Sequence, residues 1–425
     1  VELRTRGVTN VARGIIDVSV RFTPLTGGGG CSLISAVPGP DLSANGFRES
    51  EYAASGLAWR YRPDGTGAHA VEPVGQAQFS TRITVRRPHT AAQFNGCVVV
   101  EWLNVSSGAD AAPEYSFLAP EIIRGGYAWV GISAQYTGIA GGPGSVEGTP
   151  GGGLTGLVNS DEERYGRLFH PGDAYCWDIF GAVAQTLREP DDPRDPLSGL
   201  MIDRVLAVGE SQSAFALTTY ANVFQKRHNT FDGLLIHSRA AGSLPLGEVG
   251  GGIAVDDVFA HDPVTIRSDL DVPVIIAQTE TDLLTNFRFD RARQPDSDRL
   301  RIWEMAGTAH ADLTQIGEYE SLLNCPTPVN RGQQRFTLRA ALHHLHRWSQ
   351  GIGSPPSAPG LHIDYSGATP EFVTDDVGNV LGGVRTPGVD APSQVLSGIV
   401  RGDVSRICVL FGSTTPAVRE VLLAR

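Results

Sequence analysis

Apolar and polar residues follow two different patterns along this chain. Within the first ninety residues, short apolar stretches alternate with turns, and three of them are predicted to be strands, at residues 15–22, 58–61 and 79–86. Short strands separated by turns are typical of antiparallel pairing. Residues 1–90 are therefore predicted to form an antiparallel, β-rich beginning of a sheet.

From Cys97 onwards, continuous apolar runs alternate with segments of helical periodicity. Such runs are typical of strands that are buried on both faces. Six are predicted, at residues 97–103, 127–133, 205–208, 233–237, 272–278 and 300–305. Helices are predicted to end at Arg124 and to cover residues 173–188, 213–225 and 333–348. This alternation predicts a mostly parallel sheet with helices on both faces, formed by residues 91–350.

Two segments depart from the alternation. Residues 241–270 separate the fourth and fifth core strands and are too many for an ordinary connection. Their position predicts a lid over the carboxyl edge of the sheet, where ligands bind in open α/β sheets. The glycines at 242, 247 and 250–252 are the expected hinges. Residues 351–425 are rich in proline and glycine and predict an irregular extension that packs on the core.

Composition narrows the range of functions. The net charge is −12 and no basic run occurs, so a nucleic-acid partner is not expected. No apolar run reaches the roughly 20 residues of a membrane-spanning helix. Residues 1–20 do not resemble a signal peptide, because polar and charged residues interrupt every apolar stretch. A signal removed before Val1 would leave the same sequence. A soluble cytoplasmic protein and a secreted one therefore both stay open, as does the oligomeric state.

Five cysteines occur, at positions 31, 97, 176, 325 and 408, and none forms a C-x-x-C pair. Neither a zinc site nor a thioredoxin-like site is therefore indicated, and no metal is expected. Cys97 and Cys176 lie in apolar segments and are expected to be buried thiols. Cys408 lies in a short apolar stretch predicted to be a strand. A Cys325–Cys408 disulfide would be compatible with an oxidising compartment.

The most informative segment is RVLAVGESQSA, at residues 204–214. An apolar strand runs directly into Ser211, and a helix follows at once, as in a nucleophile elbow. The sharp turn requires small residues two positions before and after the nucleophile. Gly209 meets that need, and Ser213 stands where the commoner motif has glycine. The alternative is that Ser211 is only a helix N-cap. The partners that follow later in the chain favour the elbow.

Hydrolases with this elbow carry their acid and base after the serine, in that order. His310 follows the last core strand and is the predicted base. Asp282 follows the strand before it and is the preferred acid, while Glu280, nearer the strand end, is the alternative. Either carboxylate would hold the imidazole tautomer and stabilise the imidazolium.

Backbone N–H groups near the elbow are expected to bind the oxyanion. One is that of Gln212, and the second belongs to Val105 or Asn104, in the loop after the strand at residues 97–103. Three further side chains follow other strands and are candidates for the pocket wall: Tyr136, His237 and Arg239.

Nine short segments together carry a resemblance to a known family. They are VVVEWLNVSSG (98–108), YGRLFHPGDAYCWDIF (165–180), GESQSA (209–214), LLIHSRA (234–240), AQTETD (277–282), AGTAHAD (306–312), CPTPVN (325–330), GGVRTP (382–387) and CVLFGST (408–414). From about residue 45 to 414, the chain resembles a large, mostly bacterial family known as alpha/beta hydrolase domain-containing proteins. The resemblance implies an α/β-hydrolase fold and a serine-hydrolase triad, with Gln212 and Ser213 as the family's form of the elbow. It implies no substrate.

These observations predict an enzyme that cleaves a carboxylic ester of a small or medium-sized molecule through an acyl-enzyme on Ser211, without a metal or organic cofactor. Three alternatives stay open. They are acyl transfer to an alcohol or amine by the same residues, hydrolysis of a lactone, amide or peptide, and a non-catalytic ligand-binding relative. Haloalkane-dehalogenase and epoxide-hydrolase chemistries need a carboxylate nucleophile, and Ser211 occupies that position.

Overall fold

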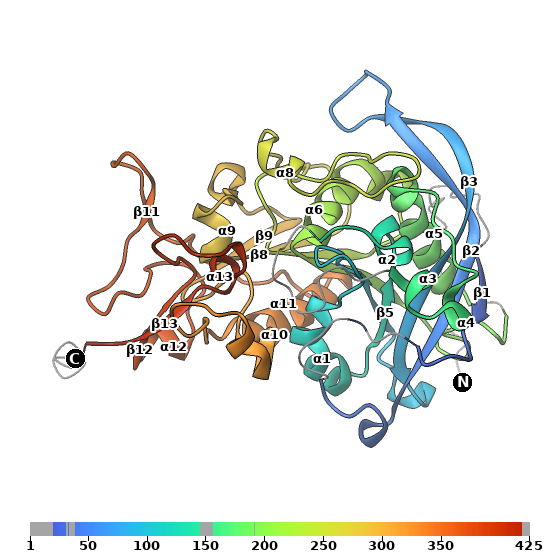
Figure 1. Ribbon diagram of the computed structural model, residues 1–425, viewed down its shortest axis with the longest axis horizontal. Helices are drawn as coiled ribbons and strands as arrows, with labels where there is room; N and C mark the ends of the chain where they lie inside the picture. The colour runs from blue at the N-terminus through green and yellow to red at the C-terminus, as the bar shows by residue number, and fades with distance from the viewer. Residues whose placement is uncertain (1–19, 31–32, 34–38, 145–155, 191, 419–425) are drawn as a thin grey trace, which may run out of the picture.

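One nine-stranded sheet organises the protein. The computed structural model describes residues 20–30, 33, 39–144, 156–190 and 192–418. The strands lie in the order β1-β2-β3-β5-β4-β6-β7-β8-β9 (Figure 1). Their bounds are β1 Arg21–Pro24, β2 Phe47–Pro63, β3 Val71–Pro88, β4 Cys97–Trp102, β5 Ala128–Ile132, β6 Arg204–Glu210, β7 Gly233–His237, β8 Val274–Thr279 and β9 Leu300–Met305. β1 pairs with β2, β2 with β3 and β3 with β5, and all three pairs are antiparallel. The strands β4 to β9 run parallel to one another, as predicted.

Helices cover both faces of the parallel part, because successive strand residues point to opposite sides. On one face, Val99 and Leu206 pack against α1 (Pro113–Gly125) and α11 (Gln334–Ser349). On the other, neighbouring strand positions pack against α5 (Cys176–Arg188) and α6 (Gln212–Thr219). Two apolar cores on either side of one sheet confirm the predicted α/β-hydrolase fold.

The chain order creates a switch point beside β4. From β4 the chain passes to β5 on one side, and it then returns across β4 to β6 on the other. β4 and β6 are neighbours in the sheet, and Glu101 of β4 pairs with Val208 of β6. The loops that follow these two strands therefore start side by side and lead away in different directions. Ligands bind at such points in open α/β sheets. The predicted nucleophile and the predicted oxyanion loop both lie there.

The antiparallel part is larger than its hydrophobic pattern indicates. β2 and β3 form one hairpin that pairs from Phe47 with Pro88 to Pro63 with Val71, and its tip projects beyond the rest of the molecule (Figure 1). The hydrophobic pattern predicts only residues 58–61, toward the tip, and residues 79–86, in the half nearer the sheet. Backbone pairing in a solvent-exposed hairpin needs no apolar alternation, so most of β2 lacks that signal. The strand predicted at residues 15–22 falls largely outside the described residues, and β1 begins at Arg21.

The remaining elements are short. They are α2 Tyr136–Ala140, α3 Gly156–Ser160, α4 Glu162–Tyr165, α7 Gln225–His228, α8 Asp257–Ala260, α9 Glu280–Leu284, α10 Leu313–Ile316, α12 Pro387–Asp390, α13 Arg406–Phe411 and the strands β10 Ile363–Asp364, β11 Glu371–Phe372, β12 Gln394–Ser397 and β13 Ser413–Pro416. The extension after residue 350 gathers at the end of the molecule opposite the hairpin (Figure 1). Among the described helices, none has the length and apolar character needed to cross a membrane.

Two predicted elements need correction. The stretch around Cys408 is helix α13 and not a strand, because a short apolar run fits either structure until its packing decides. The helix predicted at residues 213–225 is interrupted by a π-helical turn, Tyr220–Phe224. The Cys325–Cys408 disulfide, which the sequence left open, is present. Cys97 and Cys176 are buried free thiols, as predicted.

Candidate active site

Ser211 stands at a sharp turn between β6 and α6. Its backbone has φ 60° and ψ −123°, which is strained for any residue other than glycine. Such a conformation costs on the order of 1–3 kcal/mol and persists only where its surroundings fix it. The Ser211 N–H donates to the carbonyl of His237, at the end of β7, at 3.0 Å. The turn is thereby tied to the neighbouring strand.

Gly209 and Ser213 pack directly against each other beneath the turn. A Cβ placed on Gly209 would lie 2.9 Å from Cβ of Ser213 and 3.2 Å from its carbonyl carbon. The first distance is shorter than real Cβ contacts, and the second is unusually tight. One of the two positions must therefore lack a side chain, and glycine at 209 lets serine occupy 213.

His310 reaches Ser211 from the loop that follows β9. Its Nε2 lies 2.9 Å from Oγ of Ser211. The backbone N–H of His310 donates to Oγ1 of Thr281 at 3.2 Å, and the Phe287 ring packs on the imidazole with centroids 4.5 Å apart. The imidazole is thus held from the backbone side and from one face.

Asp282 completes a hydrogen-bonded chain. Nδ1–H of His310 donates to Oδ1 of Asp282 at 2.7 Å, which leaves the Nε2 lone pair facing the serine hydroxyl. Oδ2 accepts hydrogen bonds from Oγ of Ser238 and from the backbone N–H of Thr279, both at 2.7 Å. Asp282 is fully buried, so these donors replace the water that the carboxylate lacks.

Glu280, the alternative acid, faces away from the histidine ring. Its two carboxylate oxygens accept the backbone N–H groups of Gly307, at 2.6 Å, and Gly398, at 2.8 Å. Burial raises the pKa of Glu280 to about 7, although these two donors act to lower it. Glu280 thus joins the strand that carries Asp282 to the His310 loop and to the C-terminal extension.

Two of the three predicted oxyanion donors are free. Within the described part of the chain, no acceptor faces the N–H of Val105 or that of Gln212. The N–H of Asn104 donates to the carbonyl of Ala111 at 2.9 Å, so it is unavailable. The side chain of Asn104 instead donates to the carbonyl of Glu210 at 3.1 Å and joins the two loops.

Two cavities that share lining residues lie near the elbow, and Ser211 lines the smaller one. The smaller, about 20 Å³, is lined by Ser106, Ser211, Gln212, Phe215, Val255, Phe259, Phe287, Arg406 and Leu410. The larger, about 350 Å³, shares Gln212 and Val255 with it, and Tyr136 is one of its lining residues. A mostly apolar chamber at the serine therefore continues into a roomier, more polar one.

His237 and Arg239, the other predicted wall residues, line neither cavity. Both are fully buried. The guanidinium of Arg239 donates to the carbonyls of Ala240, Ala241 and Val264, so it supports the insertion from within. His237 lies behind the elbow with Nδ1 3.5 Å from a carboxylate oxygen of Glu114. Burial acts to lower the pKa of His237, but Glu114 raises it to about 9.

The insertion reaches the cavity at Ser211 with two residues near its middle, Val255 and Phe259. Its first half is fastened to the start of α5, because Ala174 donates to the carbonyl of Glu248, Asp173 donates to that of Gly251, and the Asp173 carboxylate accepts the N–H of Ile253. The predicted hinges at positions 247 and 250–252 lie in this fastened part. Beyond it, Val255 and Phe259 wall the small cavity. Movement of this second half as a lid stays a prediction.

Several contacting residues were not anticipated from the sequence. Ser238 could have been found, since it follows the strand between those carrying Ser211 and Asp282. Phe287 and Leu410 could not have been predicted, because the sequence does not show which residues an apolar side chain will contact. No group of three or more metal-ligating side chains occurs among the described residues.

Comparison with known proteins gives a family and distant structural likenesses. The sequence model of a family described as "Alpha/beta hydrolase domain" matches residues 21–425. No curated protein matches the chain. Solved structures that match include a chain from a study of two fungal esterases from Rhizomucor miehei, with 10% identity, a TM-score of 0.36, and coverage of 72% of this chain and 85% of that one.

Two further structures match at a similar distance. XC6422 from Xanthomonas campestris, described as an α/β serine hydrolase without a lid, has 12% identity and a TM-score of 0.32, and covers 79% of this chain and 100% of its own. The esterase Est22 has 15% identity and a TM-score of 0.36, with 72% and 81% covered. At these scores the likenesses indicate neither substrate nor mechanism.

The two carboxylates can be distinguished by amide substitution. Asp282→Asn should lower kcat by about 10²–10⁴, because an amide facing Nδ1 favours the wrong imidazole tautomer. Glu280→Gln should lower kcat by less than about tenfold and reduce the melting temperature, since its contacts are with backbone. The comparison is made by measuring kcat on a chromogenic ester, with the enzyme concentration taken as that of the folded protein. The reverse ranking would move the acid to Glu280.

Glu210, directly before the nucleophile, should make stability depend on pH. It is buried, and Oε2 accepts Nε2–H of Gln315 at 2.7 Å. Burial raises the pKa of Glu210 from 4.5 to about 7, against the opposing pull of His237 and His310. Between these two values the native state holds more protons than the unfolded state, so stability falls as pH rises.

Glu210→Gln should remove part of that slope, at most about 1.4 kcal/mol per pH unit. Denaturant unfolding at several pH values between 4.5 and 7.5 measures it. Glu318→Gln, at an exposed carboxylate, is the matched control and should keep the wild-type slope. Equal slopes in all three proteins would contradict the assignment to Glu210.

Proposed function

Because the chain belongs to the alpha/beta hydrolase domain family, we propose that it is a serine hydrolase that cleaves a carboxylic ester through an acyl-enzyme on Ser211. The observation that carries the proposal is the unbroken chain of hydrogen bonds from Ser211 through His310 to Asp282, at 2.9 and 2.7 Å. This geometry provides a nucleophile, a base within reach of its proton, and a group that orients the base.

In the first half of the reaction, Oγ of Ser211 attacks the ester carbonyl carbon while Nε2 of His310 takes the hydroxyl proton. Asp282 stabilises the resulting imidazolium without accepting its proton. His310 then gives this proton to the alcohol oxygen, the carbon–oxygen bond breaks, and the acyl group stays on Ser211. Water completes the cycle by the same route, releasing the carboxylic acid and restoring the serine hydroxyl.

The negative charge on the carbonyl oxygen is assigned to the N–H groups of Val105 and Gln212. Neither has an acceptor among the described residues. Gln212 is also the first residue of α6, where the helix end adds positive potential. Asn104 acts indirectly, since its bond to the Glu210 carbonyl keeps the two donors on the same side of the serine.

The cavities support a small or medium-sized substrate. Phe215, Phe259 and Phe287 form mutual edge contacts around the serine, with centroids 5.3–6.0 Å apart. The larger cavity beyond Gln212 has room for a group of moderate size. One part of the ester is therefore expected to be small and apolar.

Labelling with a fluorophosphonate tests the nucleophile most directly. The expected result is one adduct on the peptide that contains Ser211, together with hydrolysis of p-nitrophenyl esters. Ser211→Ala should lose both, with kcat lower by about 10⁴–10⁶ and an unchanged circular dichroism spectrum. Wild-type rates in this variant would refute the proposal.

His310→Ala should lose almost as much activity as Ser211→Ala, and the double variant should be little worse. The two groups act as a unit, so their losses do not multiply. Kinetics on the three variants under identical conditions gives the comparison. If the losses multiply instead, His310 is not the base for Ser211.

The enzyme is expected not to hydrolyse polymeric esters, because such substrates could not reach Ser211. Residues of the insertion and of the extension both stand over Ser211, so soluble short-chain esters should react, whereas an insoluble polyester film should not. Acid release from both substrates at equal enzyme concentration checks this. Rapid erosion of the film would show that the serine is open.

A further inference from the structure

The C-terminal extension forms one wall of the chamber that contains Ser211. Arg406 and Leu410, both on α13, line this cavity. At about 20 Å³ the cavity holds about one water-sized group. The apolar side chain of Leu410 is partly buried, so part of it stays free to meet a substrate.

Two other residues that line the cavity are directly connected to the triad, whereas Leu410 is not. Phe215 lies one helical turn after Ser211 on the same helix, and Phe287 packs on His310. A change at either would disturb the serine or its base. Leu410 contributes no atom to the hydrogen bonds between Ser211, His310 and Asp282. The chamber can therefore be widened at Leu410 without altering the triad.

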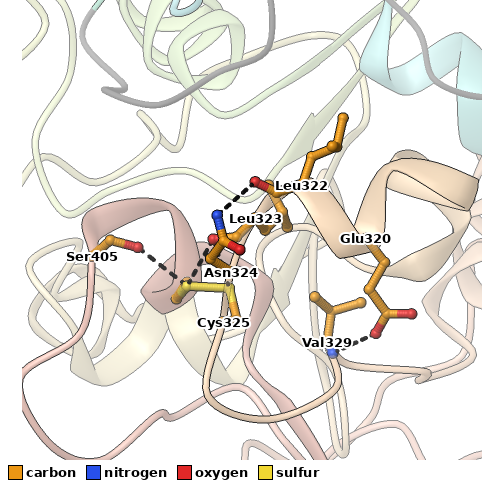
Figure 2. Close-up of a disulfide and its surroundings, with 8 residues drawn as sticks. Glu320, Leu322, Leu323, Asn324, Cys325, Val329 and Ser405 are labelled. Carbon is orange, nitrogen blue, oxygen red and sulfur yellow. Dashed lines mark hydrogen bonds between the residues drawn. A yellow bond between two sulfur atoms is a disulfide. The ribbon is translucent and has the colours of Figure 1, made fainter.

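α13 is too short to be stable alone, because helices of fewer than about 12 residues are marginal in water. Of its six residues, Ile407, Leu410 and Phe411 pack against the apolar cluster of Ala311, Leu323 and Val329, and three bonds add to this packing. The Cys325–Cys408 disulfide anchors its middle to the loop before α11 (Figure 2). At its end, the Leu410 carbonyl accepts the N–H of Ala311 at 3.0 Å, and the carbonyl of the next residue accepts that of Asn330 at 2.8 Å.

A further contact of α13, an ion pair, joins it to the insertion. Nη2 of Arg406 lies 2.7 Å from a carboxylate oxygen of Asp256, and the two side chains are 40% and 65% exposed. Ion pairs so open to solvent contribute little. The disulfide is thus the strongest tie between α13 and the rest of the protein, and it lies only two residues before Leu410.

We propose that Leu410 limits the size of the ester group that reaches Ser211, and that the Cys325–Cys408 disulfide keeps Leu410 in this limiting place. The inference rests on the proposed function and names the feature that selects its substrates. Esters with one short group react in the native protein. Loss of the side chain at 410, or of the disulfide, admits longer groups while the triad stays intact.

The first test compares Leu410→Ala with the wild type on two ester series. One series varies the acyl group of p-nitrophenyl esters, and the other varies the alkyl group of esters of one acid. In the series whose variable group faces Leu410, kcat/KM for the six-carbon member relative to the two-carbon member should rise about tenfold or more. A ratio within about twofold of wild type in both series overturns the proposal.

Leu322→Ala is the matched control. Leu322 lies close to the disulfide in Figure 2, is 54% exposed and does not line the cavity. Removal of its side chain should leave the size preference unchanged. The same shift in this control would show that the effect is not specific to the chamber wall.

The second test concerns the disulfide. Dithiothreitol should convert Cys325 and Cys408 to two thiols while it is itself oxidised to its cyclic disulfide. After reduction, kcat/KM for the six-carbon ester relative to the two-carbon ester should rise, as expected for Leu410→Ala. The Cys325→Ala/Cys408→Ala variant should show that preference from the start and should not respond to the reductant, because it lacks the disulfide that the reductant breaks.

A uniform fall of kcat/KM across both series after reduction would mean that the disulfide only supports stability, and would overturn its part of the proposal. Circular dichroism of the reduced wild type confirms that the fold persists. If the double variant does not fold, the wild type with and without reductant supplies the comparison.

Fluorophosphonate labelling separates failure of this inference from failure of the proposed function. In that reaction, Oγ of Ser211 displaces fluoride from phosphorus and His310 takes the hydroxyl proton. No adduct and no ester hydrolysis in the wild type means that the proposed function is wrong. An adduct with an unaltered size preference in Leu410→Ala means that only the assignment of Leu410 is wrong.

Discussion

The backbone of Ser211 holds a conformation that costs energy, and the surrounding structure is arranged to keep it. Its φ of 60° lifts the hydroxyl above the sheet, and the N–H of Gln212 has no acceptor among the residues that the structure describes. Gly209 makes room beneath the turn, and the carbonyl of His237 fixes it from the adjacent strand. Asn104 binds the carbonyl just before it. The packing beneath the turn and these two hydrogen bonds offset the strain at this one residue.

Much of this arrangement follows from the parallel sheet and could be predicted from sequence. Continuous apolar runs mark strands buried on both faces, and parallel strands all end at one edge. Polar residues just after those runs must therefore meet, which is how Ser211, Asp282 and His310 could be chosen from residues far apart in the chain. The choice of Asp282 over Glu280 rested on position alone, and the hydrogen bonds now favour the same residue.

Features that depend on tertiary packing between distant segments could not be predicted from the sequence pattern. The stretch around Cys408 fits a strand as well as a helix, and its packing beside Ala311 decides for helix α13. Arg239 follows a core strand as the site residues do, yet its guanidinium turns inward to three carbonyls. Glu280 ties together three segments whose proximity no local pattern could reveal.

The position of α13 in the chain has a consequence for how the protein is made. Ser211, Asp282 and His310 are all synthesised well before Leu410, because synthesis proceeds from the N-terminus. A growing chain can thus bring the three together while the wall beside the serine does not yet exist. Such an intermediate has its serine uncovered on that side. The Cys325–Cys408 disulfide can form only after Cys408 has been added, so the bond that fixes this wall spans a sequence separation of 83 residues and is completed late in synthesis.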